Sequence, residues 1–150
     1  MTQPVVFFID SSLGGLILKQ ALQQEGEQVA LHDEHFPQGT LDVDWLPDVA
    51  LRGWLILSAD QRIRYNEIEW LAVLNSGAKV FVLVSGNLTG EQQAQAFVQV
   101  LKKMKNTATR EPKGFIALVY RNGRLILPKR NRDSRKGNPA QKDGSASISP

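Results

Sequence analysis

The sequence predicts an α/β protein with three layers (α/β/α), in which a doubly wound, mostly parallel sheet lies between two layers of helices. Short apolar segments alternate with segments of helical periodicity, which is the pattern of successive βαβ units. The apolar segments, such as Pro4-Val-Val-Phe-Phe-Ile9, are continuous, as expected of strands buried on both faces. Further along, Asn122-Gly123 separates two apolar segments, which predicts a C-terminal β-hairpin.

The apolar segments predict six strands, at residues 4–9, 28–32, 54–57, 79–84, 115–120 and 124–127. Helices are expected at 13–25, 42–52, 66–75 and 89–105. Residues 33–40, which contain Pro37 and Gly39, are expected to form a loop. Pro47 is expected in the first turn of its helix, where its missing N–H is not needed.

Three of these helices carry a capping signal at their start. Ser11 or Ser12 can cap the first helix, and Asn66 can cap the third. Thr89, followed three residues later by Gln92, forms a capping box for the long fourth helix. These side chains therefore predict where the helices begin.

The composition places the chain among globular proteins. Its 150 residues give room for one domain with a substantial core. The absence of cysteine excludes disulfides, thiolate metal sites and cysteine nucleophiles, and it suits a reducing cytosol. The N-terminal segment lacks a basic region and is too short for a signal peptide, and no segment reaches the roughly 20 apolar residues that span a bilayer. We expect a cytoplasmic protein without a membrane segment.

The net charge of +3 comes from the C-terminal segment, residues 129–150. This segment holds six basic and two acidic residues, and residues 1–128 hold 12 basic and 13 acidic ones. It has too few apolar residues to order itself, so we expect one domain at 1–128 followed by a disordered basic tail. The tail could attract RNA through counterion release or serve only as a solubilising extension, and we favour the second interpretation.

Three aspartates, Asp10, Asp42 and Asp60, stand at matching points of the predicted fold. Asp10 and Asp60 each follow an apolar segment, and Asp42 opens the segment between them. Open α/β sheets bind ligands at the carboxyl ends of their strands, where these side chains would meet. Carboxylates held close together repel one another, and a hard cation such as Mg²⁺ relieves the repulsion. The three residues predict an acidic metal site, with helix capping as the alternative role for each.

Several motifs follow one another in a distinctive order. Phe-Ile-Asp10 is followed by a helix, and His-Phe-Pro-Gln-Gly leads to Asp42-Val-Asp-Trp45-Leu-Pro. Leu-Ser-Ala-Asp60-Gln-Arg-Ile-Arg is followed by Glu69 on the next helix. In this order and spacing, roughly residues 4–127 resemble the PIN-like domains of the VapC toxin type.

The resemblance implies an endoribonuclease that depends on Mg²⁺ or Mn²⁺ and hydrolyses RNA phosphodiester bonds as the toxin of a toxin–antitoxin pair. Carried over residue by residue, Asp10, Asp42 and Asp60 would be its catalytic metal ligands. A cognate antitoxin and a second copy of the chain are the implied protein partners. Bound metals can neutralise the phosphate and deprotonate a water, so this chemistry requires no nucleophilic side chain.

One residue of the family pattern is missing. PIN nucleases have a fourth acidic residue shortly after the third-strand aspartate, and residues 61–65 contain none. Glu67 or Glu69 on the following helix could serve, and the spacing from Asp60 favours Glu69 as the fourth catalytic residue.

Two further choices concern neighbours of the aspartates. Asp44 competes with Asp42 for the second position, and two residues apart on a helix they face different directions, so we expect only one to point at the metal. Arg62 and Arg64 follow Asp60, and we expect them to bind the RNA backbone or to neutralise the carboxylates.

Other functions fit the residues less well. The first alternative is a catalytically silent PIN-like module that binds RNA or protein. A receiver domain needs an acidic pair after its first strand, but Ser11 follows Asp10, and a dehalogenase-type phosphohydrolase needs aspartate where Ser12 stands. His32 and His35 flank an acidic pair, but the sequence offers no second group of ligands for a transition metal.

Overall fold

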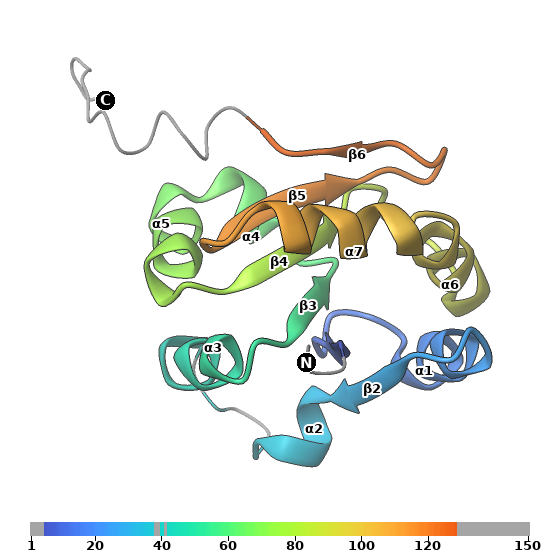
Figure 1. Ribbon diagram of the computed structural model, residues 1–150, viewed down its shortest axis with the longest axis horizontal. Coiled ribbons are helices and arrows are strands. Elements are labelled where there is room, and N and C mark those ends of the chain that lie inside the picture. The colour runs from blue at the N-terminus through green and yellow to red at the C-terminus, as the bar shows by residue number, and fades with distance from the viewer. Residues whose placement is uncertain (1–4, 38–39, 41, 129–150) are drawn as a thin grey trace.

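Six strands form a single sheet that carries helices on both faces in the computed structural model, which describes residues 5–37, 40 and 42–128 (Figure 1). The strands are β1 (Val6–Ile9), β2 (Gln28–Leu31), β3 (Leu55–Ser58), β4 (Lys79–Leu83), β5 (Phe115–Val119) and β6 (Leu125–Ile126). The helices are α1 (Gly15–Gln24), α2 (His32–His35), α3 (Asp42–Leu51), α4 (Arg62–Tyr65), α5 (Glu67–Ser76), α6 (Gly90–Gln99) and α7 (Leu101–Arg110).

The order of the strands creates the crevice that the sequence predicts. The sheet runs β2-β1-β3-β4-β5-β6, with the first five strands parallel and β6 antiparallel to β5. From β1 the chain passes to β2 on one side and then to β3 on the other, so the winding direction reverses between β1 and β3. Ligands of doubly wound folds bind beside the carboxyl ends of the strands at this point. The predicted fold class and the C-terminal hairpin are confirmed.

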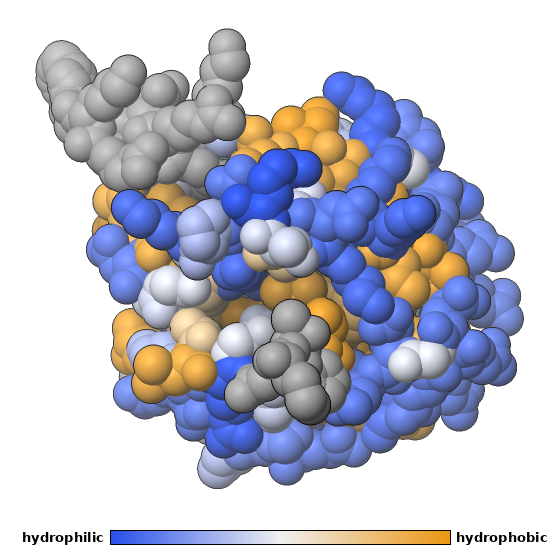
Figure 2. All heavy atoms as spheres, viewed as in Figure 1, coloured by the Kyte–Doolittle hydropathy of each residue, from blue (hydrophilic) through white to orange (hydrophobic). Residues whose placement is uncertain are grey.

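Two apolar cores lie on opposite faces of the sheet because neighbouring residues of a strand point to opposite sides. Phe7 and Ile9 of β1 join the core under α1, α6 and α7, whereas Phe8 joins the core under α3 and α5. Trp45 and Trp70 are buried in the second core, and half-buried Trp54 packs against it. Hydrophilic side chains cover most of the face shown in Figure 2.

The predicted caps of α5 and α6 are confirmed, but that of α1 is wrong. The Asn66 side chain accepts hydrogen bonds from two backbone N–H groups of α5, and Thr89 and Gln92 form the capping box of α6. Helix α1 begins at Gly15, and neither Ser11 nor Ser12 caps it. The hydroxyl of Ser12 is bound to the carboxylate of Asp10 instead.

The position of Pro47 also differs from the prediction. It is the sixth residue of α3 as described, inside the helix rather than in its first turn. The buried side chains Trp45, Leu46 and Val49 hold this amphipathic helix on the sheet, and such tertiary packing offsets the missing N–H bond. Local propensity alone cannot reveal that compensation.

Three segments are more helical than expected. Residues 32–35 form the short helix α2 rather than the end of a strand and a loop, and residues 62–65 form the unexpected turn α4. The helix expected at 89–105 is two helices that meet at Val100 and extend to Arg110. Val100 is fully buried, so core packing fixes the change of direction there.

None of the helices in the described ranges has the length and apolarity that a bilayer crossing requires.

The basic tail predicted at 129–150 lies outside the described residues.

Candidate active site at the carboxyl ends of β1 and β3

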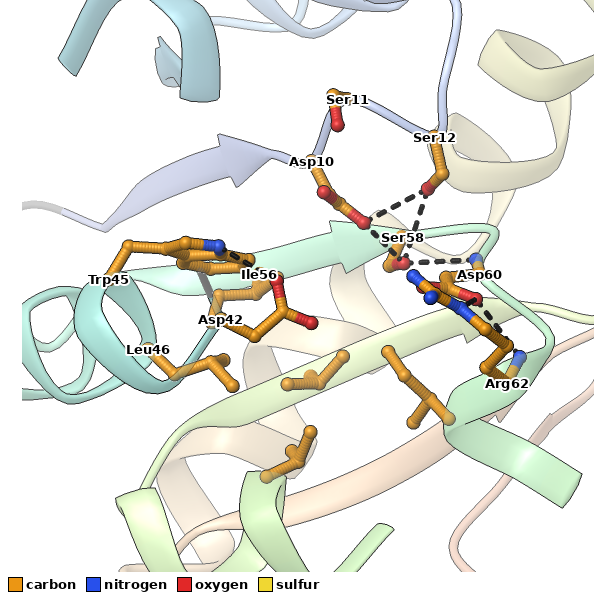
Figure 3. Close-up of a pocket in the computed structure, with 13 residues that line it drawn as sticks. Asp10, Ser11, Ser12, Asp42, Trp45, Leu46, Ile56, Ser58, Asp60 and Arg62 are labelled. Carbon is orange, nitrogen blue, oxygen red and sulfur yellow. Dashed lines mark hydrogen bonds and ion pairs between the residues drawn. The ribbon is translucent and has the colours of Figure 1, made fainter. Parts of the chain in front are cut away.

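A pocket opens where the winding direction of the sheet reverses (Figure 3). All three predicted aspartates line it, and they come from three separate parts of the chain: the end of β1, the start of α3 and the loop after β3. Its polar lining residues are Asp10, Ser11, Ser12, Asp42, Ser58, Asp60 and Arg62. Its apolar lining residues are Trp45, Leu46, Ile56, Ile63, Val73 and Val80.

Asp10 is fixed by two serine hydroxyls. Oγ of Ser58 donates to Oδ2 of Asp10 at 2.8 Å, and Oγ of Ser12 donates to the same oxygen at 3.0 Å. The two hydroxyl oxygens are 3.3 Å apart, and Oγ of Ser12 also accepts a bond from the backbone N–H of Ala59 at 2.9 Å. These bonds join the ends of β1 and β3 and hold the Asp10 carboxylate in one orientation.

The environment of Asp10 opposes its ionisation. Burial raises the pKa of the Asp10 carboxyl group above its ordinary value, and the negative charge of Asp42 adds to this rise. The hydrogen bonds from Ser58 and Ser12 act in the opposite direction, because they stabilise the carboxylate. The net shift is upward, so the pocket favours any positive charge that comes close to Asp10.

Asp60 is bound by the guanidinium of Arg62. Nη2 of Arg62 lies 2.7 Å from Oδ2 of Asp60, and Nε lies 3.1 Å from Oδ1 and 3.2 Å from Oδ2. The backbone N–H of Arg62 adds a bond of 3.0 Å to Oδ1. Hydrogen bonds from Arg62 lower the pKa of Asp60, because they stabilise its charged form more than partial burial destabilises it. Asp60 is therefore an ionised carboxylate with a cation already beside it.

The structure separates Asp42 from its competitor Asp44. Nε1 of Trp45 donates to Oδ1 of Asp42 at 3.0 Å, which aims this carboxylate into the pocket (Figure 3). Asp44, two residues along the same helix, is exposed and is not among the lining residues. The indole of Trp45 is buried in the core, so the packing of α3 on the sheet fixes the donor that positions Asp42.

Glu69 and Arg64 lie outside the set that lines the pocket. Glu69 is half-buried in the first turn of α5, and its charge acts on Arg62, whose pKa is raised mainly by Asp60. Nη1 of Arg64 donates to Oε1 of Gln61 at 3.1 Å, and its guanidinium lies over the ring of Tyr65. The pocket thus contains three of the four predicted catalytic acids and one of the two predicted arginines.

Sequence reasoning missed the importance of Ser58 and Gln61. Ser58 is fully buried, and its hydroxyl also accepts a bond from the backbone N–H of Asp60 at 3.0 Å. Nε2 of Gln61 donates to the carbonyl oxygens of Ala59 at 3.0 Å and Leu83 at 2.8 Å, which ties the loop after β3 to the end of β4. Ser58 could have been noticed as the one polar residue of an otherwise apolar strand, but nothing local distinguishes Gln61.

The donor set suits a hard divalent cation in type, since carboxylate and hydroxyl oxygens are the ligands that Mg²⁺ and Mn²⁺ prefer. Its spacing is less suitable. Within the described ranges, no three histidine, aspartate or glutamate side chains lie close enough together to hold a metal ion. The rings of His32 and His35 instead pack against Phe8 in an aromatic cluster.

Comparison with known proteins identifies the family. The model of the PIN-like domain matches residues 5–85, which include all three aspartates of the pocket. A protein of Mycobacterium tuberculosis (strain ATCC 25618 / H37Rv), named "Putative ribonuclease VapC45", is 31% identical over 117 residues, which cover 75% of this chain and 84% of the relative. No solved structure matches the chain significantly. The fold, the position of the acidic pocket and these two matches agree, and the chain belongs to the PIN-like domain family, of the VapC type.

Proposed function

We propose that this protein is a metal-dependent endoribonuclease that hydrolyses RNA phosphodiester bonds as the toxin of a toxin–antitoxin pair. The observation that carries the proposal is the convergence of Asp10, Asp42 and Asp60 on one pocket where the winding of the sheet reverses. The name of the mycobacterial relative supports the same activity.

Asp10, Asp42 and Asp60 would hold Mg²⁺ or Mn²⁺ in this pocket. When bound, such an ion supplies charge neutralisation at the phosphate and a deprotonated water. The chain contributes orientation: Ser58 and Ser12 fix Asp10, and the indole of Trp45 fixes Asp42. Ligands whose rotamers are locked by such partners hold a reacting group in a narrow range of positions.

Arg62, Arg64 and Glu69 have proposed roles next to the metal ligands. Arg62 lines the pocket and can reach a phosphate, and Arg64 follows it on the same helical turn α4. A guanidinium binds phosphate oxygens with two parallel hydrogen bonds, which suits both for the RNA backbone. Glu69 would act as the fourth acid, and the effect of its charge on Arg62 supports a role at the edge of the site.

The proposed protein partner is a cognate antitoxin that covers the pocket. The helices that line the pocket also expose apolar side chains, with Val43 65% exposed on α3 and Ile68 79% exposed on α5. Contact with a partner protein would remove this apolar surface from water. A homodimer and a cytoplasmic location belong to the same proposal.

A catalytically silent PIN-like module is the second candidate. The observation in its favour is that the described acidic side chains do not approach closely enough to hold an ion, while Asp60 is occupied by Arg62. Such a module would bind RNA or a protein partner without cleaving RNA.

Cleavage of a mixed single-stranded RNA pool tests the two candidates. The purified protein is incubated with Mg²⁺, Mn²⁺ or EDTA, next to Asp60→Asn and the matched control Asp44→Asn. Asp44 is an exposed aspartate outside the pocket, so its substitution makes the same chemical change without touching the site. We expect cleavage that requires the metal, is lost in Asp60→Asn and is retained in Asp44→Asn. RNA binding without cleavage under any metal would favour the silent module.

A further inference from the structure

We propose that Arg62 competes with the divalent cation for Asp60, so that the ion binds only when the guanidinium leaves this carboxylate. The inference rests on the proposed function, because it concerns the same pocket and the same ion. It assigns Arg62 a role in controlling metal affinity, in addition to a role in binding RNA.

The first argument is the number of acceptor positions on Asp60. An ionised carboxylate offers about four lone-pair positions on its two oxygens. Oδ1 accepts from the backbone N–H and from Nε of Arg62, and Oδ2 accepts from Nε and Nη2 of the same residue. Three N–H groups of Arg62 are thus directed at Asp60, and the single Nε–H is shared between both oxygens. A metal ion that binds both oxygens of Asp60 side by side, as the guanidinium does here, needs the position that the side chain of Arg62 occupies.

The second argument is electrostatic. The guanidinium extends from α4 across Asp60 toward the side of the pocket where Asp10 and Asp42 lie (Figure 3). Its nitrogens lie 2.7 to 3.2 Å from the oxygens of Asp60. The positive charge of Arg62 therefore already offsets part of the negative charge of the pocket carboxylates. A divalent cation there would be repelled by the guanidinium at short range.

The third argument concerns how easily the pair can separate. The side chain of Arg62 is 69% exposed, whereas that of Asp60 is 18% exposed. Water can solvate a departing guanidinium, and exposed ion pairs are weak compared with buried ones. After leaving Asp60, Arg62 would still stand at the rim of the pocket, where it can bind a phosphate oxygen. The same side chain would thus oppose the ion and then bind the substrate.

Direct measurement of Mn²⁺ binding tests the competition without any need for activity. The dissociation constant is measured by titration calorimetry for the unmodified protein, Arg62→Gln and Arg62→Lys. Arg52→Gln is the matched control, because Nε of Arg52, just beyond α3, forms a similar surface pair at 2.7 Å with Asp48 of α3, outside the pocket. Circular dichroism of each variant establishes that the fold is retained.

We expect Arg62→Gln to bind Mn²⁺ about two- to fivefold more tightly, the range for one partly exposed ion pair. Arg62→Lys should lie between Arg62→Gln and the unmodified protein, since an ammonium keeps the charge but cannot bind both oxygens side by side. Arg52→Gln should leave the affinity unchanged. Equal or weaker binding by Arg62→Gln would overturn the competition alone. Absence of Mn²⁺ binding in every protein would overturn the proposed metal site as well as the competition.

The departure of the guanidinium can be observed separately by nuclear magnetic resonance. The Nε–H signal of Arg62 should shift and exchange faster with water when Mg²⁺ is added, while that of Arg52 stays unchanged. An unchanged Arg62 signal at saturating Mg²⁺ would mean that the ion and the guanidinium bind together, which contradicts the proposal.

Discussion

The hydroxyl of Ser58 donates a hydrogen bond of 2.8 Å to Oδ2 of Asp10 and thereby joins the carboxyl ends of β3 and β1. Ser58 is fully buried, so this bond is made away from competing water. Because its acceptor is a carboxylate, the bond belongs to the stronger, charge-assisted class. The pair therefore serves both the stability of the sheet at this edge and the orientation of the proposed metal ligand.

Ser58→Ala is expected to lower the free energy of unfolding by about 1–3 kcal/mol, because a buried carboxylate loses a hydrogen-bond donor. It should also raise the pKa of Asp10 further, since the bond from Ser58 lowers this pKa. Urea denaturation measures the first effect. Ser11→Ala is the control: Ser11 is exposed, so a change above about 0.5 kcal/mol there would contradict the special role of Ser58.

Asp10→Asn is expected to stabilise the fold at neutral pH by about 0.5–2 kcal/mol while abolishing cleavage. The pKa of Asp10 is raised by burial, so the folded protein holds this proton more tightly than the unfolded chain. The contribution of Asp10 to stability is present below the ordinary aspartate pKa and is lost as the pH rises through the raised value. Urea titrations across this interval should show the loss in the unmodified protein and not in Asp10→Asn.

Asp60 is expected to contribute to stability with the opposite pH dependence, and Asp60→Asn should remove this contribution. The bonds from Arg62 lower the pKa of Asp60, so its contribution is present above the ordinary aspartate pKa and is lost as the pH falls through the lowered value. The pair is partly exposed, and its loss should cost at most about 1 kcal/mol at neutral pH. Thermal unfolding at several acidic pH values measures the effect, and a larger loss of stability on acidification in Asp60→Asn than in the unmodified protein would contradict it.

Trp45→Phe is expected to reduce the rate of RNA cleavage by about tenfold or more, the usual effect of removing a partner that orients a metal ligand. Phenylalanine keeps an aromatic ring in the core but lacks the Nε1 donor that holds Asp42. Rates at saturating metal, with urea denaturation to check the fold, measure the effect. Trp54→Phe is the control, because Trp54 packs against the same core without lining the pocket. Equal rates in both variants would show that the indole bond is dispensable.

Deleting residues 129–150 is expected to flatten the salt dependence of RNA binding if the tail binds phosphates. For each phosphate that the tail no longer neutralises, the slope of log affinity against log salt should fall by about 0.7 on single-stranded RNA. A full-length variant with the six basic residues of the tail replaced by glutamine separates charge from length. An unchanged slope in both proteins would leave the tail as a solubilising extension.

The sequence by itself determined the fold class, the six strands and the caps of α5 and α6. The bonds from Asn66, and those between Thr89 and Gln92, join residues two or three positions apart, so local residue types are sufficient to predict them. Continuous apolar segments similarly identify buried parallel strands. The sequence also predicted that Asp10 and Asp60 would line one crevice, because parallel strands end at the same edge of a sheet.

Only the tertiary structure decided the details that depend on residues distant in the chain. Ser58 bonds to Asp10 across 48 residues, and Nε2 of Gln61 reaches the carbonyl of Leu83 on a neighbouring strand. The choice of Asp42 over Asp44 depends on the rotation of α3, which is fixed by the burial of Trp45 in the core. No local pattern fixes the register between strands or decides which side chains of distant segments meet, because both arise from packing against elements elsewhere in the sequence.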